Sequence, residues 1–241
     1  MIKNDVILQI NQLSKKTNKS TLIEPLNYNV SRGQILAICG GNGAGKSTLI
    51  KLIIGLIKAT SGDVIVSGLK KSDNKRKYLE QFGYMPDDFI FPGSMTTREL
   101  IEFYARIKNV NKQKYEDILD EVGLLDKLNE KVGNFSKGMK QRLLLAQTLL
   151  SDPNILILDE PTNGLDPYWI NQLCHIMLTA KKNDQTVIFS THDLHVVEKI
   201  ADEVLFLGSG QVIGSGPIQH YLDEGLYETF QKLYFDELYS K

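Results

Sequence analysis

The residues with the clearest chemical meaning form a glycine-rich segment at positions 40–48, GGNGAGKST, which has the form G-x-x-x-x-G-K-[ST]. Glycines let a backbone curl so that successive N–H groups point at phosphate oxygens. The lysine can then meet the terminal phosphates, and the serine hydroxyl can bind Mg²⁺. The expected nucleotide-binding residues are Gly40, Gly41, Asn42, Gly43, Ala44, Gly45, Lys46, Ser47 and Thr48.

The elements around this segment favour that interpretation over a glycine turn that merely precedes a lysine and a serine. The apolar run at residues 35–39 predicts a buried strand, and residues 47–57 predict a buried helix. A strand, a glycine loop and a helix form the context in which the helix N-terminus also attracts a phosphate. We therefore expect this chain to bind a nucleotide.

Two acidic residues follow a second apolar run. Residues 155–158 predict a buried strand, and Asp159 and Glu160 come directly after it. Ligands bind at the carboxyl edge of a parallel sheet, so these carboxylates should lie beside the glycine loop. We expect Asp159 to hold Mg²⁺ and Glu160 to polarise an attacking water. Without the glycine loop, an acidic turn at a strand end would be the better interpretation.

The first third of the chain supplies the strands that must position the glycine loop. The alternating runs at residues 6–10 and 26–30 predict antiparallel strands around a polar loop at residues 14–21. Residues 60–63 predict a turn, and residues 64–66 a further strand.

A helical insert is expected at residues 88–150, between two regions of α/β pattern. Thr96 and Glu99 have the capping-box spacing, and apolar residues follow at helical intervals. Further helices are expected at about residues 112–122 and from Ser136 through Leu150. After the insert, we expect a helix at residues 171–182, a strand at 186–189, and a hairpin of strands at 204–207 and 211–213, followed by an amphipathic tail.

Composition limits the functional classes. A net charge of −1 gives no electrostatic case for nucleic acid as a partner. Cys39 and Cys174 do not make a disulfide framework, which suits a reducing compartment. The first residues lack the apolar region of a signal peptide, and no apolar run is long enough to cross a bilayer. If the protein acts at a membrane, we expect another chain to cross it.

Three further motifs give the chain a family resemblance. Residues 134–142, NFSKGMKQR, resemble the ABC ATPase signature in its L-S-x-G-x-x-x-R form. Residues 159–167, DEPTNGLDP, look like that family's Walker B motif and D-loop, and residues 190–193, STHD, look like its H-loop. Ser136 is also a suitable N-cap, so its hydroxyl and the nearby N–H groups offer an anion site. A helix start without a ligand would be the usual interpretation of an isolated Ser-x-Gly.

The resemblance implies an α/β fold: a P-loop NTPase (RecA-like) core with an antiparallel β subdomain and a helical ABC insert. Residues 1–87 and 151–218 would form the core with its β subdomain, and residues 88–150 the helical signature subdomain. Residues 219–241 would be a short C-terminal tail within the same single domain.

The resemblance also implies that two chains clamp two molecules of ATP head to tail, each with Mg²⁺. The signature residues that would meet the γ-phosphate held by the opposite subunit are Ser136, Lys137, Gly138 and Met139, with Asp166 in the D-loop. Glu160 and His192 would be catalytic, although an isolated histidine at a strand end is more often structural. The metal ligands would be Ser47, Asp87 and Asp159.

Three positions depart from the family pattern. Thr17 stands where many members have an aromatic residue that stacks on adenine. Asp87 follows residues 83–86 where the family usually has glutamine, and it could still approach Mg²⁺. Gly41 replaces a common proline, which loosens the loop.

We interpret the chain as the ATP-hydrolysing subunit of an ABC transporter, similar to exporter-type ATPases for multidrug and bacitracin resistance and for nitrous-oxide-reductase maturation. It would dimerise, as a homodimer or a heterodimer, and dock on a separate transmembrane permease near residues 89–95. It would therefore be cytoplasmic and peripheral on the inner face of the membrane, with no nucleic acid as a partner. A soluble ABC ATPase of DNA repair or translation is the alternative, whereas a small-molecule kinase leaves the signature unexplained.

Thr17 generates a prediction about base selectivity. The loss of one aromatic platform costs about 1–3 kcal/mol of base stacking, so GTP should compete well with ATP for the wild-type protein. Thr17→Tyr should tighten the binding of ATP preferentially. Competition titrations of both proteins with ATP and GTP would test this. Strong ATP selectivity in the wild type would contradict it and would indicate that another side chain stacks on the base.

Overall fold

Five parallel strands and one antiparallel edge strand form the larger of two sheets in the computed structural model, which describes residues 6–239. In spatial order, the strands are β10 (Gln211–Pro217), β9 (Glu203–Gly208), β3 (Ile35–Cys39), β8 (Thr186–Thr191), β7 (Ile155–Asp159) and β6 (Phe82–Met85). Every residue of β3 and of β7 is buried, which is typical of parallel strands covered on both faces. The expected strands at residues 35–39 and 155–158 are therefore confirmed.

The second sheet of the described residues is antiparallel and has the order β2-β1-β4-β5. Its strands are β1 (Val6–Lys16), β2 (Thr21–Ser31), β4 (Ser61–Val66) and β5 (Leu69–Lys70). The expected antiparallel pair is confirmed, but the polar loop is shorter than predicted because β1 continues through Ser14 to Lys16. Ser14 is buried, and its hydroxyl is hydrogen-bonded to that of Ser61 at 2.8 Å, so the expected turn at residues 60–63 is instead the start of β4.

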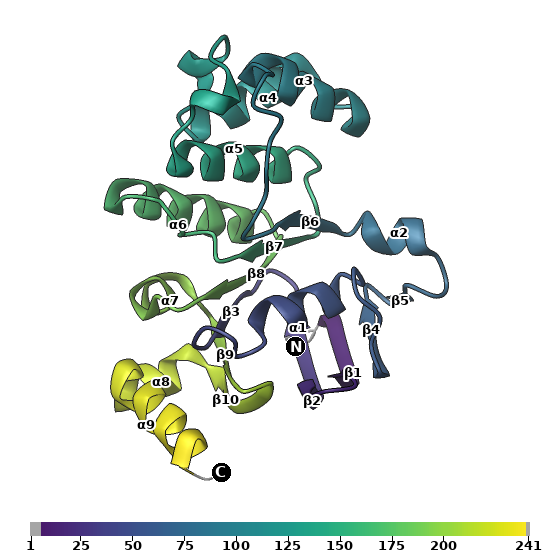
Figure 1. Ribbon diagram of the computed structural model, residues 1–241, viewed down its shortest axis with the longest axis vertical. Coiled ribbons are helices and arrows are strands. Elements are labelled where there is room, and N and C mark those ends of the chain that lie inside the picture. The colour runs from purple at the N-terminus through teal and green to yellow at the C-terminus, as the bar shows by residue number, and fades with distance from the viewer. Residues whose placement is uncertain (1–5, 240–241) are drawn as a thin grey trace.

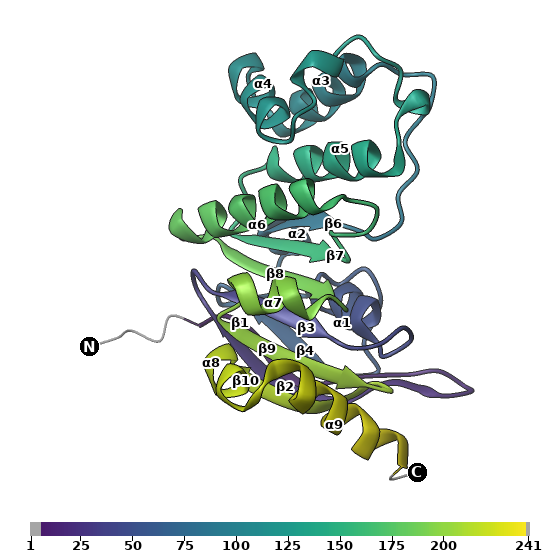
Figure 2. The ribbon, with the colours of Figure 1, turned by 90° about the vertical axis from the view of Figure 1, so that its left-hand side faces the viewer.

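Helices lie on both faces of the larger sheet, and further helices extend into a separate layer (Figures 1 and 2). They are α1 (Lys46–Ile53), α2 (Lys75–Leu79), α3 (Thr97–Lys108), α4 (Lys112–Glu121), α5 (Lys137–Leu149), α6 (Pro167–Lys182), α7 (Leu194–Ile200), α8 (Ile218–Glu224) and α9 (Leu226–Tyr239), with 3-10 turns η1 (Leu125–Lys127) and η2 (Val132–Asn134). Alternate residues of β3 pack into two different hydrophobic cores, one on each face of the sheet. Ala37 packs with α5, α6 and α7, whereas Ile38 packs with α1 and the antiparallel sheet.

The helical insert begins as its sequence predicts. The Thr96 hydroxyl accepts a hydrogen bond from the Glu99 N–H at 3.2 Å, and the Glu99 carboxylate accepts one from the Thr96 N–H at 2.8 Å, which completes the capping box. The second helix stops at Gly123, whose φ of +62° suits the end of a helix. In Figure 2, α3 and α4 lie beyond α5, on the side away from the antiparallel sheet. The assignment of residues 88–150 to a separate helical subdomain stays a proposal.

Two helix boundaries differ from the prediction. The helix after the glycine loop ends at Ile53 rather than at residue 57, because Gly55 adopts a φ of +71° that cannot continue a right-handed helix. Helix α6 begins at Pro167 rather than at Asn171, because Asp166 caps it and proline is well suited to the first helical position. Strand β6 and helices α2 and α7 were not expected.

The C-terminal tail forms helices α8 and α9, which continue the amphipathic pattern expected there. Leu226 is buried in the larger core, and Phe230 and Leu233 pack against it. Within residues 6–239, no helix combines the length and apolar character needed to cross a membrane.

Candidate functional site

The phosphate loop, residues 40–48, connects β3 to α1 at the carboxyl edge of the larger sheet (Figure 2). Gly43 and Gly45 have φ angles of +80° and +105°, a left-handed conformation that a side chain would strain. No side chain caps α1 at Gly45, so the N–H groups of its first turn lack that kind of partner. The loop therefore has the backbone of an anion-binding site.

Lys46 lies inside this loop and carries a buried charge. Its ammonium group donates hydrogen bonds to the carbonyl of Gly40 at 2.8 Å and to that of Gly41 at 3.3 Å. It also pairs with the Glu160 carboxylate at 2.9 Å, and the two side chains are only 6% and 8% exposed. A buried charge of this kind requires a partner of opposite charge, which each residue provides for the other.

Glu160 occupies an unusual backbone conformation directly after β7. Its φ is +49°, which is rare for a residue with a side chain and is common at functional sites. Its N–H donates to the Ser190 hydroxyl at 2.9 Å, and His192 Nδ1 lies 3.0 Å from its other carboxylate oxygen. Since the His192 side chain is 59% exposed, the carboxylate lies between a buried ammonium and an imidazole open to solvent.

Asp159 is fully buried and accepts two hydroxyl hydrogen bonds. Ser190 Oγ donates to its carboxylate at 2.6 Å, and Ser47 Oγ donates at 3.0 Å. Burial raises the pKa of Asp159, the hydrogen bonds from Ser190 and Ser47 act against that rise, and the nearby charges of Asp87 and Glu160 add to it. The structure thus brings Ser47 and Asp159 together, as the sequence predicted.

Asp87 lies near this pair but has a partner that the sequence did not indicate. The Asn163 side-chain amide donates to the Asp87 carboxylate at 2.7 Å. The carboxylate is nevertheless close enough to affect the pKa of Asp159. No group of three or more His, Cys, Asp and Glu side chains suited to a metal occurs in residues 6–239. A metal ion here would therefore take much of its coordination from phosphate or water, as Mg²⁺ usually does.

The signature residues form a second, separate feature. The Ser136 hydroxyl caps α5 by accepting a hydrogen bond from the Met139 N–H at 3.2 Å, and Ser136 and Lys137 are exposed. A β-carbon at Gly138 would lie 2.7 Å from the carbonyl oxygen of Gly164, so the signature packs closely on the segment after Glu160. Asp166 ends that segment by capping α6.

Within one chain, the signature does not reach the phosphate loop. In the described residues, no recorded hydrogen bond or ion pair joins residues 136–139 to residues 40–48. Figures 1 and 2 both place the start of α5 apart from the loop between β3 and α1. The phosphate loop and the signature are therefore two separate features of one chain.

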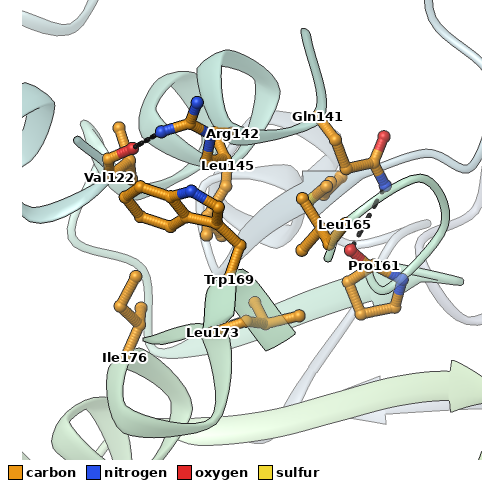
Figure 3. Close-up of a pocket in the computed structure, with 10 residues that line it drawn as sticks. Val122, Gln141, Arg142, Leu145, Pro161, Leu165, Trp169, Leu173 and Ile176 are labelled. Carbon is orange, nitrogen blue, oxygen red and sulfur yellow. Dashed lines mark hydrogen bonds between the residues drawn. The ribbon is translucent and has the colours of Figure 1, made fainter. Parts of the chain in front are cut away.

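A half-buried contact joins the signature helix to α6 (Figure 3). Arg142 Nη1 donates to the carbonyls of Val122 and Gly123 at 3.0 and 3.1 Å, and the guanidinium lies 3.9 Å from the centroid of the Trp169 ring. The Gln141 side-chain amide donates to the Pro161 carbonyl at 3.4 Å. The helical subdomain is thus tied to the segment that follows Glu160.

Two residues that support the site, Ser190 and Gly210, had no role predicted from the sequence. Ser190 stands beside His192 in the STHD motif, so its position was visible although its bond to Asp159 was not. Gly210, in the turn between β9 and β10, donates its N–H to the Ala44 carbonyl at 2.9 Å and so supports the phosphate loop from a distant part of the chain. No local pattern indicates such a contact.

Comparisons with known proteins agree with this arrangement. The family model described as "ABC transporter" matches residues 23–163, more than half of the chain. The bacitracin transport ATP-binding protein BcrA of Bacillus licheniformis is 37% identical over 216 residues, which cover 89% of this chain and 71% of that protein. The lantibiotic transport ATP-binding protein SrtF of Streptococcus pyogenes is 36% identical over 207 residues, which cover 86% of this chain and 89% of that protein.

Among solved structures, cbiO1 of Clostridium perfringens, described as part of the ABC transporter complex cbiONQ, matches with a TM-score of 0.79 and 29% identity. The match covers 91% of this chain and 92% of that one. These likenesses confirm the P-loop NTPase fold expected from the motifs. The chain therefore belongs to the ABC transporter family, as one of its ATP-binding, ATP-hydrolysing subunits.

Proposed function

We propose that this chain hydrolyses Mg-ATP at the cluster formed by Lys46, Glu160 and His192, and that it drives a permease made by a separate chain. The observation that carries the proposal is the buried ion pair between Lys46 and Glu160, at the carboxyl edge of the sheet and inside a loop shaped for phosphate. The ammonium that we propose to meet the phosphates lies 2.9 Å from the carboxylate that we propose to act on water.

Each residue of the cluster then has one task. Residues 40–48 hold the phosphates through backbone N–H groups, and Lys46 exchanges its Glu160 partner for phosphate oxygens. Glu160, released from the lysine, polarises the attacking water, and His192 holds the carboxylate in place. Ser47 and Asp159 offer the hard oxygen ligands that suit Mg²⁺, with Asp87 beside them. When bound, Mg²⁺ would neutralise charge on the phosphate oxygens.

We further propose that the active unit contains two such chains arranged head to tail. Ser136 and Gly138 begin a helix whose N-terminus is exposed and distant from the phosphate loop of its own chain. A second copy, or a similar ATPase chain, would bring residues 136–139 to the nucleotide as an anion site. Asp166 would lie at the same contact because its segment packs on the signature at Gly138.

A permease fits best on the exposed apolar side chains of the helical subdomain. Ile90 is 87% exposed, and Phe103 and Ile107 are 53% and 59% exposed. We propose that the permease docks here, which would place the chain on the cytoplasmic face of a membrane. We propose export as the direction of transport, because residues 85–87 and 136–139 resemble exporter-type ATPases and the two relatives are named for bacitracin and lantibiotic transport.

Asp159→Asn tests the proposed metal site. Burial raises the pKa of Asp159, so the folded state disfavours the ionised carboxylate, and this charge costs stability at pH 7. The variant should therefore melt at a higher temperature without nucleotide, by about 2–4 °C for each kcal/mol gained. The Mg²⁺-dependent part of its stabilisation by ATP should also be smaller than that of the wild type. Thermal melts at pH 7, with ATP plus either EDTA or Mg²⁺, would check both effects. A Mg²⁺-dependent shift equal to that of the wild type would contradict the assignment.

The second experiment tests the dimer. Glu160→Gln keeps the size of the side chain but removes the carboxylate that polarises water, so this variant should bind ATP, fail to hydrolyse it and accumulate as a dimer. Adding Ser136→Arg should return it to a monomer, because the arginine would fill the place of the γ-phosphate. Size-exclusion chromatography with light scattering, with and without Mg-ATP, would measure the mass.

Matched controls for this experiment are Glu198→Gln and Ser72→Arg, which change exposed residues outside the site. Neither should alter turnover or assembly. A Glu160→Gln protein that binds ATP yet remains a monomer would count against a self-sufficient homodimer, and would favour a heterodimer or a dimer that forms only on the permease.

A further inference from the structure

Tyr234, near the end of α9, lies directly against the phosphate loop. A β-carbon built on Gly41 would overlap the phenol oxygen of Tyr234 and would lie 3.0 Å from its Cζ. The phenol oxygen thus occupies the space that a side chain at position 41 would fill. Two segments almost two hundred positions apart in the sequence meet at this contact.

Aromatic packing that begins in the core of the protein holds Tyr234 in position. Phe206, fully buried on β9, has its ring centroid 5.4 Å from that of Phe230, which in turn lies 5.4 Å from that of Tyr234. Leu233 packs against the same core. Figure 2 shows α9 running along β10 towards the edge of the sheet that carries the phosphate loop. A row of aromatic rings therefore connects the core to Gly41.

The phosphate loop needs such support because it is rich in glycine, which loses more conformational freedom on ordering than any other residue. Other contacts already restrain it. The Gly210 N–H donates to the Ala44 carbonyl, and a β-carbon at Gly45 would lie 2.8 Å from the Ile23 side chain, so both act on the second half of the loop. In the first half, Gly40 packs on β9, because a β-carbon there would overlap the Leu207 carbonyl oxygen. Tyr234 acts on the next residue, Gly41, whose carbonyl also accepts a hydrogen bond from Lys46.

We propose that Tyr234 is a positioning residue for nucleotide binding. Its phenol replaces the side chain that is absent at position 41 and holds the phosphate loop in the conformation that receives phosphate. The inference rests on the proposed assignment of residues 40–48 as the nucleotide site. Because the contact pre-organises the loop before ATP arrives, its loss should appear in nucleotide affinity and KM, and kcat should be unchanged.

The test compares Tyr234→Ala and Tyr234→Phe in the chain of residues 1–241. Titration calorimetry with the slowly hydrolysed analogue ATPγS and Mg²⁺ should show a Kd about fivefold weaker for each variant, because both lack the contacting oxygen. The phenylalanine keeps the ring that packs on Phe230, so its melting temperature should match that of the wild type. Tyr227→Ala is the control, because this tyrosine is on the same helix but its side chain is 59% exposed.

A double-mutant cycle with Gly41→Ala separates a direct contact from a general effect on α9. In the Gly41→Ala background the new methyl group overlaps the position of the phenol and must displace it. The native contact is then already lost, so Tyr234→Ala should cause no further loss of affinity. An equal loss in both backgrounds would overturn the proposal, since the tyrosine would then act elsewhere. Unchanged affinity in Tyr234→Ala would overturn it too, and tighter binding would instead make α9 an inhibitory cover.

If residues 40–48 are not the nucleotide site, the binding data would differ from all of these outcomes. In that case the wild type would not bind ATPγS, or Lys46→Ala would bind it as well as the wild type does. Either result would overturn both the site and the role of Tyr234. Normal binding by the wild type, together with loss in Lys46→Ala and no change in Tyr234→Phe or Tyr234→Ala, would overturn the role of Tyr234 alone.

Discussion

The buried ion pair between Lys46 and Glu160 is the interaction on which the rest of the site depends. Lys46 follows β3, His192 follows β8 and Glu160 follows β7, and these three strands are neighbours in the sheet. The side chains of Lys46 and Glu160 are both buried. Removing either one would leave the other charge buried without a partner, at a cost of about 3–5 kcal/mol. A phosphate can replace the carboxylate as the partner of the lysine. In the proposed mechanism the same exchange frees Glu160 to act on water, so that nucleotide binding and activation of the base are one event.

Much of this site could be predicted from the sequence because its chemistry is local. The glycine loop, the acidic pair after a strand and the caps of the helical insert are all short patterns. The rule that ligands bind at the carboxyl edge of parallel strands predicted that Asp159 and Glu160 lie beside the glycine loop, and the family resemblance added His192. In the structure Ser47 contacts Asp159, and His192 contacts Glu160. Strand β1 extends beyond its apolar residues because the polar Ser14 is hydrogen-bonded to Ser61 on the neighbouring strand β4.

Contacts between distant segments could not be predicted in this way. The bond from Asn163 to Asp87, the packing of Arg142 on Trp169 and the approach of Tyr234 to Gly41 have no signature in periodicity or spacing. Each depends on how complete elements pack together. The Arg142 contact has a mechanical consequence, because it joins the signature helix to the helix that follows the Glu160 segment. We propose that this contact passes a change at the γ-phosphate to the helical subdomain, where the permease is proposed to dock.

The most direct test of this account is an experimental structure of the wild-type protein bound to a slowly hydrolysed Mg-ATP analogue. The account predicts that the Lys46 ammonium leaves Glu160 and binds the β- and γ-phosphate oxygens. Glu160 should remain beside His192 and face the position from which water attacks. A structure with the nucleotide in the loop and Lys46 still paired with Glu160 would contradict the central claim.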